Sequence, residues 1–128
     1  MILDTSAILA IALREPERDD FLTKIGLADL VGVGAPTLVE ASIVLINRLG
    51  EPGGRWVERL VERTETVVIP FEPVHWSAAL EGWRRYGRGR HAAALNLGDC
   101  FAYATAKVAD RPLLCKGDDF AKTDLALA

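Results

Sequence analysis

The residues best suited to chemistry are acids that lie far apart in the chain but share one setting, beside or within an apolar run. They are Asp4, Glu40, Asp99 and the pair Asp118-Asp119. Carboxylates are rarely buried without a partner, and like charges held together are costly unless a cation neutralises them. Mg²⁺ takes oxygen ligands of this kind, and Mn²⁺ suits the same donors. If the fold gathers these acids, they form a divalent-metal site.

Such a site would support hydrolysis at phosphorus. A bound divalent metal lowers the pKa of its water, and a second metal about 3.5–4 Å away could stabilise the leaving oxygen. A covalent nucleophile has no comparable candidate, because neither His75 nor His91 lies in an acid–serine pattern and the G-x-S-x-G motif is absent. We therefore expect metal-activated water to be the nucleophile.

Each acid also has an ordinary structural explanation. Asp4 could cap the next helix, Glu40 could lie on a solvent face, and Asp99 could be a first-turn residue favoured by the helix dipole. Asp118-Asp119 could form a turn and an N-cap after Gly117. The sequence leaves these alternatives open one by one, and it is the joint placement of the acids that favours a site.

One dense cationic stretch precedes Asp99 in this acidic chain. Its candidate RNA-binding residues are Arg84, Arg85, Arg88, Arg90 and His91, with Trp83 and Tyr86 interleaved. The ordinary interpretation is a solvated helix end whose cations complement the helix dipole. We favour a grip on a phosphate backbone, with an aromatic ring available for base stacking, because the stretch is close to Asp99 in sequence. Single-stranded or looped RNA fits better than a long duplex, since no groove-reading helix is evident.

Alternating strands and helices must position these residues. Apolar and β-branched runs predict strands over 1–3, 31–34, 66–69 and 112–115, with a possible last strand over 125–127. Apolar periodicity predicts helices over 7–13, 17–27, 36–49, 56–63, 73–86 and 99–109, with a short one from 118. Thr5-Ser6 is the expected N-cap of the first helix, and 51–54 is an expected turn. The alternation indicates an α/β fold with a parallel sheet covered on both faces, and ligands bind at the carboxyl edge of such sheets.

Composition and charge limit the class of protein. The chain has 128 residues, half of them hydrophobic, and a formal charge of −3. These values indicate one folded domain over 1–128 and give no whole-chain signal for nucleic acid. No window reaches the length of a transmembrane helix and the first residues lack signal-peptide features, so we expect a cytoplasmic protein without membrane contact. Cys100 and Cys115 are expected to be reduced thiols in apolar surroundings.

The same residues carry a resemblance, over nearly the whole chain, to the PIN-domain ribonucleases and specifically to the VapC-type toxins of bacterial toxin–antitoxin pairs. The segments that resemble the family are Met1-Ile2-Leu3-Asp4-Thr5-Ser6-Ala7, Thr37-Leu38-Val39-Glu40, Tyr86-Gly87-Arg88-Gly89-Arg90-His91 with Leu97-Gly98-Asp99-Cys100, and residues 113–120. The resemblance implies a PIN-like three-layer α/β/α sandwich with a mostly parallel central sheet. It also implies that Asp4, Glu40 and Asp99 are catalytic acids that bind the metal.

The resemblance implies a fourth acid, for which Asp118 and Asp119 compete. Alignment on the Asp-Phe pair favours Asp119, whereas strand-end geometry favours Asp118. Thr5 and Ser6 are expected to orient Asp4 or a water of the metal. Further implications are Mg²⁺ dependence with Mn²⁺ as a possible substitute, cleavage of an RNA substrate, and a homodimer. A VapB-type antitoxin would neutralise the enzyme in a hetero-oligomer by inserting a basic side chain among the acids.

Three other classes of protein fit the residues less well. A haloacid-dehalogenase-type phosphatase needs an acid two residues after its first aspartate, where Ser6 stands. A dinucleotide-binding module needs a third glycine after Gly32-Val33-Gly34, and Pro36 follows instead. The remaining alternative is a PIN-like module that binds RNA or a partner without cleaving, and acids at all four regions argue against it.

Overall fold

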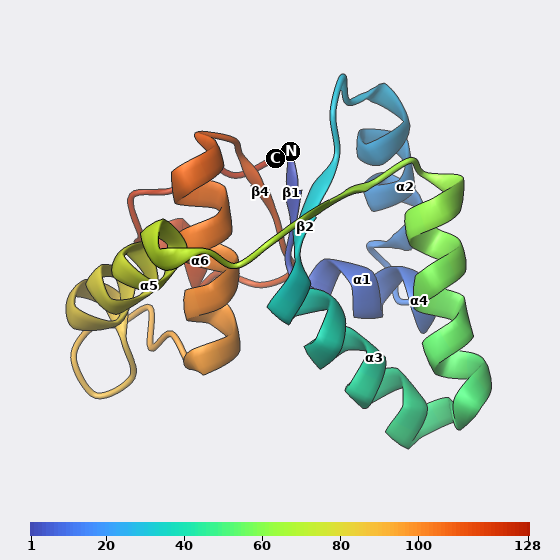
Figure 1. Ribbon diagram of the computed structural model, residues 1–128, viewed down its shortest axis with the longest axis horizontal. Coiled ribbons are helices and arrows are strands. Elements are labelled where there is room, and N and C mark those ends of the chain that lie inside the picture. The colour runs from blue at the N-terminus through green and yellow to red at the C-terminus, as the bar shows by residue number, and fades with distance from the viewer.

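A parallel sheet separates two helical layers in the computed structural model, which describes residues 1–128. Helices α5 and α6 cover one face of the sheet, and α1 to α4 cover the other (Figure 1). The strands are β1 Ile2–Leu3, β2 Gly32–Gly34, β3 Val67–Ile69 and β4 Leu113–Leu114, in the spatial order β3-β2-β1-β4 with every pairing parallel. The helices are α1 Thr5–Ala12, α2 Arg18–Leu27, α3 Ala35–Leu49, α4 Glu51–Arg63, α5 Pro73–Tyr86, α6 Leu97–Ala109 and the 3₁₀ turn η1 Phe120–Lys122. The predicted three-layer α/β/α sandwich is confirmed.

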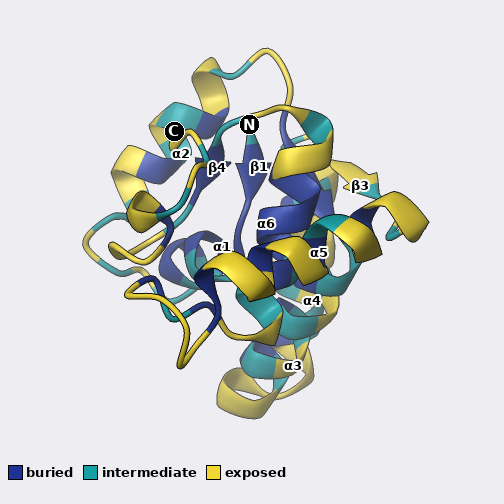
Figure 2. Cartoon of the chain, turned by 90° about the vertical axis from the view of Figure 1, so that its left-hand side faces the viewer, coloured by how far each residue is buried: buried dark blue, intermediate teal, exposed yellow.

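The paired strands β1 and β4 are short, and each divides its side chains between two cores. Ile2 pairs with Leu113 in β4, and both join the core beneath α5 and α6, which also holds Tyr103. Leu3 pairs with Leu114, and both join the core beneath α1, α2 and α4. Neighbouring strand residues point to opposite faces, so two apolar residues in succession serve both layers. Figure 2 shows β1 and β4 buried, whereas the edge strand β3 and parts of the outer helices and loops are exposed.

The expected cap of the first helix is wrong by one residue. Asp4, not Thr5-Ser6, is the N-cap of α1, and its carboxylate accepts a hydrogen bond from the Ser6 backbone N–H at 2.9 Å. The Asp4 backbone N–H donates to the Leu114 carbonyl of β4, which keeps Asp4 in the extended conformation of the sheet. The helix therefore begins at Thr5, directly beyond the strand pairing.

The expected turn over 51–54 is also wrong, because these residues form the first turn of α4. Gly50, with φ of 71°, reverses the chain after α3, and Pro52 suits the first turn of the new helix. Gly53 lies so close to α3 that a Cβ there would stand 2.3 Å from the Leu45 carbonyl oxygen. Its missing side chain thus permits the close approach of α3 and α4, a tertiary reason that local turn propensity does not reveal.

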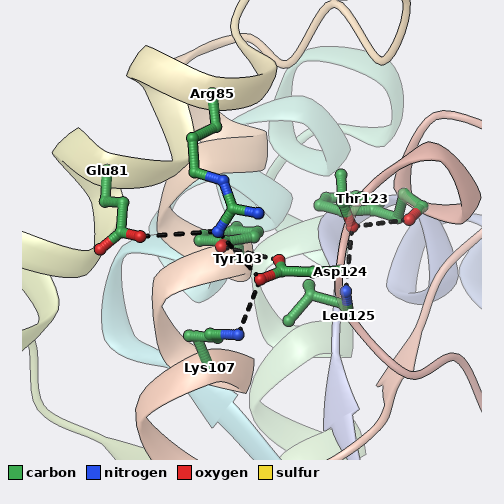
Figure 3. Close-up of polar contacts among 8 residues, drawn as sticks. Glu81, Arg85, Tyr103, Lys107, Thr123, Asp124 and Leu125 are labelled. Atoms are coloured by element: carbon green, nitrogen blue, oxygen red, sulfur yellow. Dashed lines mark hydrogen bonds and ion pairs between the residues drawn. The ribbon is translucent and has the colours of Figure 1, made fainter.

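Asp124 ties the C-terminal segment to α5 and α6. Its carboxylate accepts hydrogen bonds from Tyr103 Oη and Lys107 Nζ, both at 2.9 Å, and from Arg85 at 3.1 Å (Figure 3). The chain then runs back along β4, where Leu127 makes an isolated parallel bridge to Leu113 in place of the possible last strand. No helix of the structure has the length and apolar character needed to span a membrane.

These contacts make Asp124 a source of acid-sensitive stability. Partial burial alone would raise the pKa of Asp124, but the bonds from Lys107 and Tyr103 and the charge of Arg85 outweigh it and lower the pKa from 3.8 to about 2. The stabilisation is complete above the unfolded pKa and is lost as pH falls from about 4 to about 2. Asp124→Asn should therefore be less stable than the wild type at pH 7, and the difference should shrink on acidification, as measured by melting temperature against pH.

The matched control is Asp29→Asn, which removes an exposed carboxylate 3.6 Å from Arg111. It should leave the pH profile unchanged. Equal acid sensitivity of the wild type and Asp124→Asn would contradict a stabilising role for this cluster.

Candidate metal and catalytic site

The fold brings all four acidic regions toward the carboxyl edge of the sheet, two of them at strand ends and two within the first two turns of helices. Asp4 follows β1, Asp118-Asp119 follows the adjacent β4, Glu40 lies in the second turn of α3 behind β2, and Asp99 lies in the first turn of α6. Their charges act on one another: Asp99 raises the pKa of Asp4, and Glu40 and Asp119 raise the pKa of Asp99. Acids up to 115 positions apart in the chain thus share one electrostatic site.

Asp4 is the most buried of these acids, with 4% of its surface exposed. Burial is the main cause of its raised pKa, and the charge of Asp99 adds to it, while hydrogen bonds from the Ser6 backbone and hydroxyl act in the opposite direction. Its capping role and a site role are therefore compatible, since Ser6 engages only Oδ2 of the carboxylate.

Glu40 turns toward the site, and the solvent-face alternative is wrong. Thr5 Oγ1 donates a hydrogen bond to Glu40 Oε2 at 2.7 Å, so Thr5 orients Glu40 rather than Asp4. The carboxylate lies over Gly98, where a Cβ would stand 2.5 Å from both oxygens. By contrast, the neighbouring Val39 and Ile43 are more than half exposed. A helix that exposes apolar residues and turns an acid inward is organised around that acid.

Asp99 both caps α6 and faces the other acids. Its Oδ2 accepts the Asn96 backbone N–H at 2.8 Å, while the Asn96 side chain accepts the Asp99 backbone N–H at 2.9 Å. Partial burial is the main reason that the pKa of Asp99 is raised, and the hydrogen bond from Asn96 opposes this effect. The repulsion from Glu40 and Asp119 then exceeds the attraction of Arg88. The reciprocal cap has the capping-box spacing Asn-x-x-Asp, which the sequence alone displays.

Asp118 and Asp119 are both exposed, but only Asp119 is coupled to the site. The charge of Asp119 raises the pKa of Asp99 and of the Cys115 thiol, and its Oδ1 lies 3.5 Å from Lys122 Nζ. Asp118 makes no ion pair. Of the two competing residues, Asp119 is thus the one whose charge is among the main influences on the pKa of Asp99.

The two cysteines are free thiols, as expected. Burial and the charges of Asp4, Asp99 and Asp119 raise the pKa of Cys115 to about 12, and burial with the charge of Asp99 raises that of Cys100 to about 11. Both thiols stay protonated at neutral pH, so neither is a ready thiolate ligand. The donors at the site are accordingly oxygens.

These oxygens suit Mg²⁺ or Mn²⁺ better than a soft metal. The hydrogen bonds described above engage one oxygen of each carboxylate and leave Asp4 Oδ1, Glu40 Oε1 and Asp99 Oδ1 outside them. No group of three or more His, Cys, Asp or Glu side chains in this structure is arranged to hold a metal ion. The carboxylate oxygens at the site are the donor type that Mg²⁺ takes, whereas a closed zinc site needs four assembled ligands.

The basic stretch divides into engaged and free side chains. Arg85 pairs with Glu81 and Asp124 and stacks over the Tyr86 ring at 4.8 Å. Tyr86 is buried beneath it and packs against the His91 ring edge, so Tyr86 is not the accessible ring of this stretch. His91 is exposed, and its Nδ1 accepts the Ala93 backbone N–H at 3.1 Å.

Arg84, Arg88 and Arg90 are exposed and make no ion pair. Among them only Arg88 acts on the acid site, because its charge lowers the pKa of Asp99. Arg88 also lines an apolar hollow of about 400 Å³ with Trp76 and Trp83. The cation and the aromatic rings expected beside the acids are therefore present, with Trp83 rather than Tyr86 as the accessible ring.

Sequence reasoning missed Lys116, which joins the site through its backbone. The Lys116 N–H donates to Ser6 Oγ at 2.8 Å, and Ser6 Oγ in turn donates to Asp4. No local sequence signal points to this contact, because the two residues are 110 positions apart.

Removing the charge of Asp4 while keeping its cap should stabilise the metal-free protein. Asp4→Asn retains an oxygen that can accept the Ser6 N–H, whereas Asp4→Ala loses a cap worth about 1 kcal/mol. Because folding raises the pKa of Asp4, its carboxylate costs stability at neutral pH, and this cost disappears as pH falls. In the presence of a chelator, the melting temperature of Asp4→Asn should exceed that of the wild type at pH 7. The difference should shrink as the pH falls toward 4, and Asp4→Ala should have a lower melting temperature than Asp4→Asn. An Asp4→Asn melting temperature below that of the wild type would contradict the crowding of acids.

Comparisons with known proteins agree with this geometry. The PIN-domain family model matches residues 1–125. Ribonuclease VapC of Mycolicibacterium smegmatis is 40% identical over 126 residues, which cover 98% of each chain. Ribonuclease VapC36 of Mycobacterium tuberculosis is 41% identical over 98% of this chain and 91% of its own length.

Solved structures share the fold at low sequence identity. VapC20 of Mycobacterium tuberculosis, described as a toxin that cleaves the sarcin–ricin loop, superposes with a TM-score of 0.78 at 16% identity over 99% of this chain and 97% of its own. VapBC2 of Rickettsia felis, solved on a promoter DNA fragment, gives 0.75 at 13% identity over 99% of this chain and 96% of its own. With the acids gathered at the edge of a matching sheet and relatives this similar over their full length, the chain belongs to the PIN-domain family and, within it, to the VapC ribonucleases.

Proposed function

We propose that this protein is an endoribonuclease toxin that hydrolyses RNA phosphodiester bonds with Mg²⁺, or Mn²⁺ as a substitute, held by Asp4, Glu40, Asp99 and Asp119. The observation that carries the proposal is the coupling of Asp99 to the other three acids at the carboxyl edge of the sheet. Like charges gathered in a partly buried site favour a divalent cation. The ribonuclease activity named for relatives at 40% identity supports RNA as the substrate.

The chain's own residues would divide the work as follows. Asp4 and Asp99, each held by a helix cap, present one free oxygen to the cation, and Thr5 holds Glu40 so that it presents another. Ser6 orients Asp4 and links it to the loop that carries Asp119. The bound cation would supply a water of lowered pKa and would offset the negative charge of the reacting phosphate.

Asp99→Asn should abolish cleavage while the protein stays folded. In metal sites, loss of a residue that only supports a ligand lowers metal affinity or activity about 10- to 100-fold. Loss of the charge of a ligand itself should lower the cleavage rate by at least the upper end of that range. The neighbouring acids provide a matched pair: Asp119→Asn should slow cleavage, and Asp118→Asn should leave it within about twofold. Initial rates on a short labelled single-stranded RNA, over a range of Mn²⁺ concentrations with a chelator control, measure all three.

Unchanged cleavage by folded Asp99→Asn would remove the enzymatic proposal. The alternative is then a PIN-like module that binds RNA or a partner without cutting it. A slower Asp118→Asn with a normal Asp119→Asn would instead make Asp118 the fourth acid.

The RNA backbone would lie along the free cations of the basic stretch. Arg84, Arg88, Arg90 and the exposed edge of His91 are candidates, while Arg85 is committed to Asp124. Arg88 stands first, because it alone of them acts on Asp99 and lies beside the Trp83 ring. Arginine binds phosphate and stacks on planar groups, so one side chain can serve both contacts.

Arg88→Ala should weaken RNA binding and lower the salt slope of the binding constant by about one. Fluorescence anisotropy with uncleavable Asp99→Asn as parent measures both quantities. Arg111→Ala is the control, because Arg111 lies before β4 at the opposite edge of the sheet and pairs with Asp29. If the salt slope of RNA binding is unchanged in Arg88→Ala, the basic stretch is a solvated surface and does not bind RNA.

A VapB-type antitoxin is the proposed inhibitor and would form a hetero-oligomer with this chain. A hollow of about 410 Å³ lies between α1, α2 and α4, with Trp56 and Leu60 in its apolar part. Four arginines surround it: Arg14, Arg18, Arg59 and Arg63. Only Arg18 of these four has an ion pair. An acidic amphipathic segment fits this hollow, and a basic side chain from the same partner could replace the cation among the acids. Complex formation that does not weaken with salt would contradict this docking.

A homodimer is proposed through the apolar face next to the site. Two hollows that share Leu97 and Phe101 run along this face, and its most exposed apolar side chains are Trp76, Leu97, Val39 and Ile43. Exposed apolar patches of this kind mark interfaces. A monomeric mass by light scattering at tens of micromolar would contradict the dimer. We infer a cytoplasmic location, because the proposed RNA substrate is found there.

A further inference from the structure

The loop between β4 and η1 carries the proposed fourth acid but buries none of its residues 116–119. Residues 116–119 are all exposed, and Gly117 has φ of 91° with open space around it. Phe120 is buried and anchors the far end of the loop. At the near end the anchor is Lys116, whose backbone N–H donates to Ser6 Oγ. Lys116 thus links this loop, through Ser6, to the carboxylate of Asp4.

The Lys116 side chain makes a second, separate attachment. Its ammonium lies 2.8 Å from Glu15 Oε2 and 3.1 Å from Glu17 Oε2, in the turn that joins α1 to α2. The hydrogen bond to Glu15 and the ion pair with Glu17 raise the pKa of Lys116, so its side chain stays cationic at neutral pH. Pro16 between the two glutamates restricts the backbone that presents them. One residue therefore contacts the start of α1 through its backbone and the end of α1 through its side chain.

This ion pair is too exposed to be explained as a source of stability. All three side chains are about one third exposed, and exposed ion pairs contribute little to folding. Lys116 is not among the main causes of the raised pKa of Asp4 or of Asp99, which are burial, hydrogen bonds and the charges of other residues. What the contact changes is geometry, because it fixes where Ser6 and the aspartate loop lie relative to Asp4.

We infer that Lys116 is a positioning residue of the metal site, which latches the β4–η1 loop to the α1–α2 turn through Glu15 and Glu17. The inference rests on the proposed function and adds to it a residue that binds neither metal nor RNA. Without the latch, the Ser6 hydroxyl loses the partner that orients it toward Asp4, and Asp119 is no longer held beside Asp99.

The experiment measures Mn²⁺ binding by calorimetry, without RNA, in the full-length protein. Lys116→Met should weaken Mn²⁺ about tenfold, as loss of an outer-shell contact does, and Lys116→Arg should stay within about twofold of the wild type. The double variant Glu15→Gln with Glu17→Gln should reproduce the loss, and adding Lys116→Met to it should cause no further change, because the three residues act as one unit. In cleavage assays the Mn²⁺ dependence should shift while KM for RNA stays unchanged.

Lys107→Met is the matched control. It removes the same ammonium from a similarly exposed ion pair, 2.9 Å from Asp124, on the outer side of α6. It should leave Mn²⁺ affinity unchanged, so a general effect of losing a surface lysine is separated from the latch.

Two outcomes overturn the inference alone: wild-type Mn²⁺ affinity in both Lys116→Met and the glutamate double variant, or an equal loss in Lys107→Met. In either case wild-type binding and cleavage would leave the proposed function standing. If the wild type itself neither binds Mn²⁺ nor cleaves RNA, the proposed function fails and the positioning role fails with it.

Discussion

The structure depends on holding several carboxylates near one another at the carboxyl edge of a parallel sheet. Burial and mutual repulsion raise the pKa values of Asp4 and Asp99, so the arrangement works against folding in the absence of a cation. The protein offsets this cost locally. Asp4 and Asp99 each cap a helix and Glu40 accepts a hydrogen bond from Thr5, so every acid has one oxygen tied to the fold and another left for a ligand. Structural and chemical roles are thus shared by the same side chains.

Residues around the acid site are likewise divided between structural contacts and positions near the acids. In the basic stretch, Arg85 and Tyr86 stabilise the junction of α5, α6 and the C-terminal segment, while the charge of Arg88 lowers the pKa of Asp99. In α3, Glu40 faces inward while Val39 and Ile43 remain exposed beside it. An apolar surface therefore adjoins the acid site, where a second copy or a nucleic acid base would meet it.

Much of the architecture follows from local sequence. The apolar pairs Ile2–Leu3 and Leu113–Leu114 serve two cores at once, which is possible only in a strand buried on both faces, and this predicts a parallel sheet between helical layers. The errors lie where a distant contact overrides local preference. Residues 51–54 have the composition of a turn, yet they continue as helix because Gly53 allows α4 to lie against Leu45. The α1 cap moves to Asp4 because pairing with β4 keeps that residue extended.

The sequence by itself determined the layered fold and the four acidic regions that supply oxygen donors, because these depend on residue type, periodicity and order along the chain. Only the tertiary structure decided which residue does what. Asp119 rather than Asp118 is coupled to Asp99, Thr5 serves Glu40, and Lys116 reaches both ends of α1. These assignments depend on distances of a few ångströms between residues that the chain separates by up to 110 positions, and neither propensity nor spacing carries that information.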